Sequence, residues 1–598
     1  MVQRTDGFAP IGDYAVIGDG RTMALVAADG AVDWWAAPTV DAPPLAAAIL
    51  DPEKGGTITL APEGDYRASR RYLPDTSVLE TTYETDSGSV RVLDSLNAGV
   101  NGPLPWTELA RRVEGLQGEV PMRWTIALGR RMTAAMPWLQ RHDDFFLVHT
   151  DRQDVAVVAD DLGDPVIDGP ELTASFTVRT GDRGLLALSA VDRLPLQIPR
   201  ASAVSDRLDE TIHYHRRWRG RIHYDGPAEE AVLRSAAVLR QLTSQTTGAQ
   251  AAAATTSLPE KIGGSRNFDY RFAWVRDASF AVDALADLAL VEEVHAILTW
   301  LLKALSHTAP EVHVFYTLDG RPAGDQMEKV PFLRGYRDSQ PVHVGNSAAS
   351  QLQLGAYGDL IDAVHRAAEI GYRLDARTAE MLSGVADRAC DLWRLPDAGI
   401  WELGDIQHYP ISKIGCWVAL DRMIGLAEDG QVASLSLPRW RIERERIREW
   451  IEQHCWSRTK QSLTFYAGTD DLDAAVLLAA RTGFWDGDDP RLATTVEAIR
   501  EELGAGGPLL YRYTGQQDKE GAFVACSFWL VEALAHLGRV KEADEVLDGM
   551  LEHCNDLGLL SEEIDPETGE LLGNFPQALS HLALIGAATA LAEARRSG

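Results

Sequence analysis

The sequence predicts two structural classes in tandem, an antiparallel β-sandwich followed by an all-helical region. The hydrophobic pattern changes near residue 205, from the alternation of strands to the spacing of helices. The chain has 598 residues, of which 45% are hydrophobic and 24% charged, so it can bury large cores. We expect a β-sandwich over residues 1–204, a linker over 205–225 and a helical domain over 226–598.

The first segment consists of short runs that alternate apolar and polar residues, separated by Gly, Asp and Pro. Asp86-Ser87-Gly88 separates two such runs, and the turn at Gly18-Asp19-Gly20 lacks the third glycine and the following helix of a dinucleotide-binding loop. Many short strands with turns between them are typical of an antiparallel sandwich. The clearest runs are residues 57–60, 77–85, 89–94, 145–149, 155–158 and 172–179.

A basic segment with interleaved aromatic residues, His213 to Tyr224, follows the strands. Such a segment can bind nucleic acid, but the chain has a formal charge of 57 − 88 = −31. We therefore interpret it as a solvated interdomain linker or helix.

The third segment shows helical periodicity throughout, beginning after Asp225-Gly226-Pro227, a cap followed by a first-turn proline. No fixed-length motif repeats, which disfavours a solenoid. Twelve helices could close as six inner and six outer ones, although periodicity does not establish closure. They are expected at 228–242, 278–288, 291–305, 348–367, 377–394, 413–427, 439–454, 474–482, 491–503, 522–537, 541–554 and 577–592.

Composition excludes several classes of function. The acidic charge argues against nucleic acids and anionic membranes as partners. The chain has no signal-peptide-like start and no apolar stretch of membrane-spanning length, so we expect a soluble cytoplasmic protein. Five cysteines without a CxxC pair and the absence of HExxH predict free thiols and no metal for the chemistry.

The first of three polar, aromatic-rich loops runs from Arg266 to Asp277 at a helix start. Arg276 and Asp277 could form a fork of hydrogen bonds to sugar hydroxyls, and Tyr270 and Trp274 could stack on a pyranose ring. The simpler alternative is a helix cap with an ion pair; the density of aromatic residues favours a sugar site.

The other two loops carry carboxyl groups. In Asp397 to Glu402 a glycine turn exposes Trp401 beside Glu402, and a carboxyl beside a large ring can have a raised pKa that suits a general acid. The loop from Gly558 to Asp565 contains Glu562 and Glu563. Taken singly, the first of these loops could be a packed tryptophan beside a solvated glutamate. The second could be a solvated acidic turn. Together, two carboxyls on separate loops are what glycoside hydrolysis requires.

The motifs, in this order, resemble glycoside hydrolase family 15, which contains glucoamylases, bacterial trehalases and related exo-acting α-glucosidases. Residues 11–14, 17–22 and 29–34 look like the trehalase-like N-terminal domain of bacterial members. The resemblance covers nearly the whole chain. In the helical part it is carried by residues 255–260, 270–277, 335–337, 345–346, 399–402, 412–413, 416–417, 520–523 and 573–577.

The resemblance implies that the helices close into an (α/α)6 barrel and that the reaction inverts the anomeric carbon, with carboxyls about 6.5–9.5 Å apart. It makes Glu402 the general acid and Glu562 the general base. Glu563 stands where the family has glutamine, which leaves open which of the two neighbours is the base. The substrate-binding residues it implies are Arg276 and Asp277 as a clamp on the non-reducing glucose, Tyr270 and Trp274 as the pocket wall, Trp401 beside the acid, and Arg512.

One departure bears on the substrate. Fungal family members carry a second glutamate directly after the acid, where this chain has Leu403, so long α-1,4-glucans need not be the substrate. The resemblance therefore implies an inverting exo-α-glucosidase acting on a small α-glucoside, most readily trehalose. A glucoamylase or isomaltose-type hydrolase acting on maltodextrin or α-1,6 ends is the alternative.

Two further classes of protein are alternatives. A disaccharide phosphorylase uses phosphate in place of the base and should lack Glu562, and a non-catalytic glucan-binding protein should not depend on Glu402. Acid–base hydrolysis needs no cofactor, although some members that resemble this chain depend on phosphate and magnesium. A homo-oligomer is compatible with the sequence.

Overall fold

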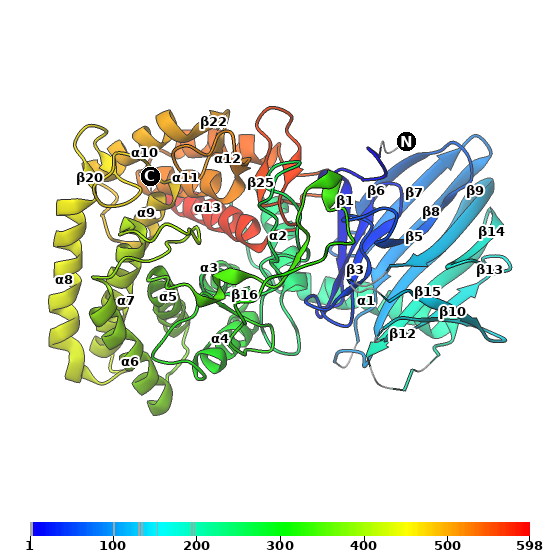
Figure 1. Ribbon diagram of the computed structural model, residues 1–598, viewed down its shortest axis with the longest axis horizontal. Coiled ribbons are helices and arrows are strands. Elements are labelled where there is room, and N and C mark those ends of the chain that lie inside the picture. The colour runs from blue at the N-terminus through cyan, green and yellow to red at the C-terminus, as the bar shows by residue number, and fades with distance from the viewer. Residues whose placement is uncertain are drawn as a thin grey trace.

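The computed structural model describes residues 4–99, 102–129, 132, 135–151, 153–192, 195–196 and 198–597. Figure 1 shows a β-domain in blue and cyan beside a larger helical domain in green to red. The described residues contain no helix with the length and apolarity needed to cross a lipid bilayer. An N-terminal antiparallel β-domain followed by a helical barrel is the fold class that the sequence predicts.

The β-domain contains fifteen strands, all paired antiparallel, within the described residues. They are β1 Tyr14–Gly18, β2 Met23–Ala27, β3 Val32–Ala36, β4 Pro44–Ala46, β5 Gly56–Pro62, β6 Arg67–Tyr72, β7 Leu79–Thr85, β8 Gly88–Leu96, β9 Thr107–Leu128, β10 Trp138–Arg141, β11 Phe146–His149, β12 Gln153–Asp160, β13 Val166–Asp168, β14 Glu171–Arg179 and β15 Arg183–Asp192. The expected turn at Asp86-Ser87-Gly88 joins β7 to β8.

The long strand β9 belongs to both layers of this domain. Its first half pairs with β8 and β15, and its second half pairs with β5 and β14. The change of partners falls near Gly118, whose φ of +68° favours glycine and lets the strand bend. A single continuous strand therefore joins the two sheets.

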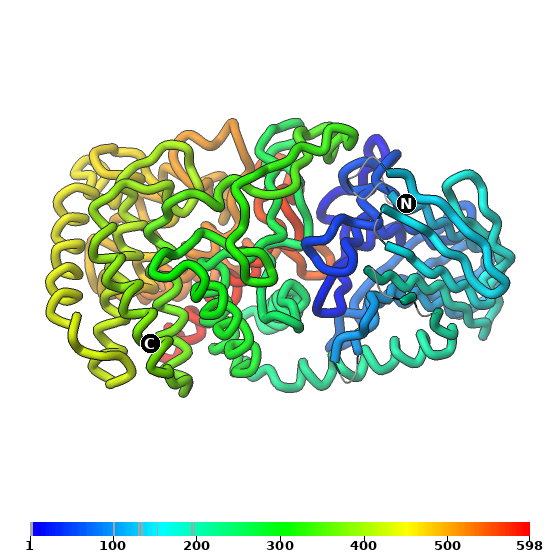
Figure 2. The backbone as a smooth tube through the Cα atoms, turned by 60° about the horizontal axis from the view of Figure 1, so that its bottom comes forward, coloured from blue at the N-terminus to red at the C-terminus, as the bar shows by residue number. Residues whose placement is uncertain are grey.

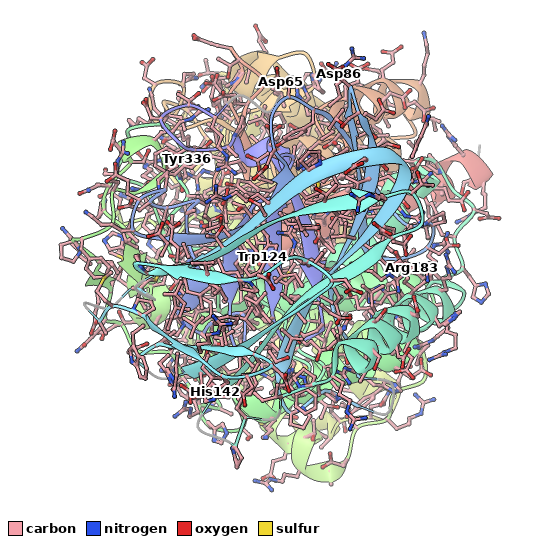
Figure 3. All side chains as sticks on the ribbon, turned by 90° about the vertical axis from the view of Figure 1, so that its right-hand side faces the viewer. Asp65, Asp86, Trp124, His142, Arg183 and Tyr336 are labelled. Atoms are coloured by element: carbon pink, nitrogen blue, oxygen red, sulfur yellow. The ribbon has the colours of Figure 1, made fainter. Side chains whose placement is uncertain are left out.

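The two layers are also joined by the buried guanidinium of Arg111, which has an ion-pair partner in its own sheet and hydrogen-bond partners in the other. The Nε of Arg111, on β9, lies 2.7 Å from the Asp94 carboxylate on β8. The same guanidinium donates to the carbonyls of Ile58 on β5 and of Gly30. Figure 3 looks onto this domain end-on, with Trp124 at the centre of the face and Asp65, Asp86 and Arg183 toward its edge.

Helix α1, Ala201–Arg219, connects the domains. It begins inside the range expected for the sandwich and occupies most of the range expected for the linker. Val204, Leu208 and Ile212 lie on one helical face and pack against the sheet through a separate apolar cluster. Figure 2 shows α1 running from the β-domain toward the barrel.

The helical domain contains twelve further α-helices among the described residues. They are α2 Glu229–Leu242, α3 Val275–Asp287, α4 Val291–Leu305, α5 Gly355–Glu369, α6 Ala376–Leu392, α7 Pro410–Glu428, α8 Leu437–His454, α9 Ala479–Thr482, α10 Pro490–Leu503, α11 Val524–His536, α12 Val540–Leu551 and α13 Ala578–Ser597. A 3₁₀ helix, η5 Ala474–Leu478, leads directly into α9.

These helices form two concentric rings. Consecutive contacts run from α3 to α5, α7, η5–α9, α11, α13 and back to α3, which closes the inner ring. The inner helices α7, α11 and α13 are buried around most of their circumference, whereas the outer helices α6 and α12 bury one face. This difference is what an (α/α)6 barrel requires, because only its outer helices meet solvent.

One expected helix begins later than predicted. The hydrophobic pattern predicts a helix from Ala348, but Ser347–Ser350 forms a 3₁₀ turn (η3) and α5 begins at Gly355. The Asn346 side chain caps this turn by accepting from the Ala348 N–H. The Leu352 carbonyl accepts from the N–H of Ala398, so the segment before α5 is held extended against a neighbouring loop.

Short strands connect the loops at one end of the barrel. β16 Ala273–Trp274 pairs with β17 Phe315–Tyr316, and β24 Ala522–Phe523 pairs with β25 Glu563–Ile564, which pairs with β26 Leu571–Leu572. The remaining short strands are β18 Glu328–Lys329, β19 His343–Val344, β20 Trp456–Ser457, β21 Ser462–Leu463, β22 Gly504–Gly506 and β23 Leu509–Leu510.

Candidate active site

Loops that directly precede inner helices meet at one end of the barrel. The loop ending at Trp274 enters α3, and the loop that carries Glu402 enters α7. The segment with Glu562 and its hairpin enters α13, and Phe523 enters α11. The N-terminal ends of the inner helices therefore surround one site, where their backbone dipoles favour negative charge.

A cavity of about 200 Å³ lies between these loops. All eight residues that the sequence singled out line it, namely Tyr270, Trp274, Arg276, Asp277, Trp401, Glu402, Arg512 and Glu562. They come from four separate stretches of the chain, so the barrel brings together side chains as much as 292 positions apart, the difference between 562 and 270.

Glu402 is positioned by its backbone as well as by its carboxyl group. Its φ of +59° is rare for a residue with a side chain, and strain of this kind persists at functional sites where the surroundings fix it. One carboxyl oxygen accepts a 2.6 Å hydrogen bond from Trp274 Nε1. Burial raises the pKa of Glu402, while Arg276 and the Trp274 hydrogen bond act in the opposite direction. The environment can thus keep the group protonated, as a general acid needs.

Glu562 is 2% exposed and is more deeply buried than the half-buried Glu402. The Tyr270 hydroxyl and the backbone N–H of Asn574 interact with its carboxyl group. Burial, together with nearby Glu260, raises its pKa to about 8, whereas Tyr270, Arg512 and Asn574 favour the ionised form. Water or sugar hydroxyls in the cavity would favour the ionised form further.

A glycine makes room for Glu562. Gly573 has a φ of +74°, and a Cβ added there would lie 2.6 Å from both Cβ and Oε2 of Glu562. Any side chain at 573 would therefore displace the carboxyl group. The Gly573 N–H is fixed by a 2.8 Å hydrogen bond to the carbonyl of Pro259.

Arg276 and Asp277 form a rigid polar pair beside the acid. Arg276 Nε donates to Asp277 at 2.9 Å, and a second guanidinium nitrogen donates to the Ile400 carbonyl at 3.3 Å. Asp277 is 1% exposed, so its carboxylate is held where sugar hydroxyls could meet it. Tyr270 and Trp274 pack edge to face, with centroids 5.5 Å apart, and form an adjoining wall.

Arg512 lies at the centre of a buried carboxylate cluster. It donates to Glu520 at 2.7 Å and to Glu260 at 3.0 Å, and Arg266 also contacts Glu520. Oxygens of Glu260, Glu520 and Glu563 lie within 4.8 Å of one another, a spacing that could suit a cation. The guanidinium groups of Arg266 and Arg512 contact these carboxylates and offset part of their negative charge.

Two residues support the site through contacts that the sequence does not indicate. Gln351 donates from Nε2 to the backbone carbonyl of Glu402 at 3.0 Å and so helps hold its unusual φ. Asp473 accepts from Trp401 Nε1 at 2.8 Å. Asp473 also accepts from the Ala475 N–H at the start of η5, the only role its sequence context indicates. Gln351 lies in irregular chain and carries no sequence signal.

Both domains match family models. The model for glycosyl hydrolases family 15 matches residues 226–543 and 536–589, and the model "Trehalase-like, N-terminal" matches residues 5–160. The two matches together span most of the chain, and the residues between them, 161–225, include α1.

Similar proteins extend over almost the full length. A trehalase of Mycolicibacterium smegmatis is 34% identical, covering 97% of this chain and 91% of its own. A trehalase of Thermoplasma volcanium is 31% identical over 98% of this chain and 94% of its own. Among solved structures, a bacterial glucoamylase complexed with acarbose superposes with a TM-score of 0.73 at 12% identity, covering 99% of this chain and 95% of its own.

Proposed function

This chain belongs to family 15 of the glycosyl hydrolases, and on that premise we propose that it hydrolyses trehalose to glucose with inversion at the attacked carbon. The observation that supports this proposal best is the single cavity where two buried carboxyls from separate loops meet a polar pair and an aromatic wall. The substrate rests on the relatives named trehalase, which match both domains.

Glu402 is proposed as the general acid. Its buried carboxyl would give a proton to the oxygen that links the two glucose units, which makes that oxygen a better leaving group. The Trp274 hydrogen bond fixes the direction of the carboxyl group, and Gln351 holds the backbone beneath it. Arg276 stands close enough to stabilise the carboxylate that forms after proton transfer.

Glu562 is proposed as the general base. It would take a proton from a water molecule as that water attacks the anomeric carbon from the face opposite the leaving group. The Tyr270 hydroxyl, which interacts with Glu562, would help to hold this water. The C–O bond of the attacked glucose breaks as the water oxygen bonds to carbon, and the proton balance is restored by exchange with solvent.

The remaining residues bind the sugar in this proposal. Arg276 and Asp277 clamp the non-reducing glucose, and Tyr270, Trp274 and Trp401 enclose it. Arg512, held by Glu260 and Glu520, faces the same cavity. Leu403 lines the leaving-group side without a charged group, which supports a small α-glucoside over an extended glucan.

The test is a substrate panel of trehalose, maltose, isomaltose and maltotetraose, with Glu402→Gln as the inactive control. We expect glucose from trehalose in clear excess over the other three. Proton NMR of the first products should show one β-glucose and one α-glucose per trehalose, because inversion changes only the attacked carbon. Faster release from maltotetraose than from trehalose would refute the substrate, and two α-glucose products would refute the mechanism.

A further inference from the structure

A second and larger cavity, of about 950 Å³, lies between the β-domain, α1 and the outer face of the barrel. It shares no lining residue with the active-site cavity. Two sequence features that the active site does not use line it, the turn at 18–20 and the basic aromatic segment of α1.

Two arginines of α2 reach into this cavity. The guanidinium of Arg234 stacks on Tyr72 of the β-domain, 3.9 Å from the ring centroid. The guanidinium of Arg240 stacks on Tyr214 and Trp218 of α1, at 4.5 and 4.4 Å. The aromatic rings of two other elements thus hold both cations in place.

Neither arginine has a carboxylate partner within 4.0 Å in the part of the chain that the structure describes. Nearby acids have other partners: Asp19 accepts from the Thr22 N–H, and Asp556 pairs with Arg70. Asp75 pairs with Arg219 at 3.8 Å. Glu229 and Glu230 line the cavity but are exposed.

The lining as a whole carries four arginines and five carboxylates, so the uncompensated positive charge is confined to the guanidiniums of Arg234 and Arg240. Burial, with Arg240 and Arg234, lowers the pKa of His215 to about 3. Burial also lowers the pKa of Arg234 and of Arg240. By contrast, the pKa of Arg271, which is paired with the Asp269 carboxylate, is raised. An unpaired buried cation is costly, and an anion in the cavity would offset that cost.

Two buried polar atoms in the cavity lining lack partners among the described residues. One is the donor Nη1 of Arg240, and the other is the acceptor Oε1 of Gln241. Gly18 faces Gln241, because a Cβ at this glycine would lie 2.9 Å from Oε1. The cavity thus presents cations for an oxyanion and an acceptor for a hydroxyl group.

We propose that this interdomain cavity is a second ligand site, which binds a small sugar bearing an oxyanion, either a phosphate ester or a carboxylate. The oxyanion lies between Arg234 and Arg240, and a sugar hydroxyl donates to Gln241. Because the site is built from both domains and α1, its ligand couples the β-domain to the barrel.

The test is isothermal titration calorimetry of the full chain, at fixed ionic strength, with glucose 6-phosphate, glucuronate, inorganic phosphate and glucose. We expect glucose 6-phosphate or glucuronate to bind at least tenfold more tightly than both inorganic phosphate and glucose. Arg240→Gln should weaken that binding at least tenfold while trehalose turnover persists. Arg217→Gln is the matched control, because Arg217 is exposed on the same helix as Tyr214 and outside the cavity lining.

Gly18→Ala is a second variant that keeps every charge but crowds Gln241, and it should also weaken binding. Thermal unfolding of each variant shows whether it is folded. If Arg240→Gln does not fold, the binding measured with Gly18→Ala tests the proposal. No binding of either sugar anion would overturn the proposal. Equal binding by the Arg240→Gln variant would place the ligand elsewhere and overturn it too, and equal affinity for inorganic phosphate would overturn the role of the sugar hydroxyl.

Discussion

The hydrogen bond from Trp274 to Glu402 makes the pKa of the proposed acid open to direct measurement. The Nε1–Oε1 distance is 2.6 Å, and Trp274 is 3% exposed. This bond favours the ionised carboxylate and therefore lowers the pKa of Glu402 against the effect of burial. Trp274→Phe removes the donor and keeps an aromatic ring in the wall.

The size of the shift follows from the strength of such a bond. A hydrogen bond to a charged group contributes about 1.5–3 kcal/mol, and one pKa unit corresponds to about 1.4 kcal/mol. Loss of the donor should therefore raise the pKa of Glu402 by about 1–2 units. The proposed acid must be protonated, so the basic limb of the kcat/KM profile should move to higher pH by the same amount.

The assay is trehalose hydrolysis between pH 4 and 10, fitted to a two-pKa profile. Trp300→Phe is the matched control, because Trp300 is buried on α4 and its Nε1 has no hydrogen-bond partner in the described chain. We expect its basic limb to be unchanged. A basic limb in Trp274→Phe that stays in place or moves to lower pH would refute the assignment of Glu402 as the titrating acid.

Five further substitutions test other parts of the structure. Glu402→Gln should lower kcat by about 10²–10⁴-fold with trehalose binding retained by calorimetry, because only proton donation is lost. Glu562→Gln should lower kcat by a similar factor, while Glu563→Gln keeps it within about tenfold; equal losses in steady-state assays would contradict the choice of base. Gly573→Ala should lower both kcat and the melting temperature, because its Cβ meets the Glu562 carboxyl group. Arg111→Ala should destabilise the protein by about 3–5 kcal/mol in urea unfolding, since it leaves Asp94 buried without a partner.

The hydrophobic period predicts most of the fold because it reports burial directly. The range expected for α4, residues 291–305, agrees with its bounds in the structure, and most other barrel helices begin within a few residues of the expected positions. The exception is α5, where Ser347–Ser350 has the composition of a helix but the capping contact of Asn346 and the neighbouring acid loop hold the chain in another shape. Such contacts join residues far apart in sequence and leave no periodic signal.

The same limit applies to the site. The eight residues could be chosen from the sequence because their chemistry is concentrated in short motifs, and the structure places them around one cavity. The sequence does not predict that Gln351 holds the backbone of Glu402 or that Asp473 accepts a hydrogen bond from Trp401. Each role depends on a single contact between residues far apart in the sequence. Arg240 and Gln241 are also unremarkable in sequence, and only the docked domains reveal their unpaired atoms.

The neighbouring carboxyls Glu562 and Glu563 differ in a way that supports Glu562 as the base. Together with Glu260 and Glu520 they place four carboxyl groups around two guanidiniums, Arg266 and Arg512. Full ionisation would leave a buried net charge of −2, so the cluster favours retention of a proton. Glu563 is the group best suited to hold it. It is fully buried, its Oε1 has no hydrogen-bond partner in the described chain, and burial with Glu260 and Glu520 raises its pKa well above the usual range. A proton held there removes one negative charge from beside Glu562, which then ionises more readily and faces the cavity with the Tyr270 hydroxyl.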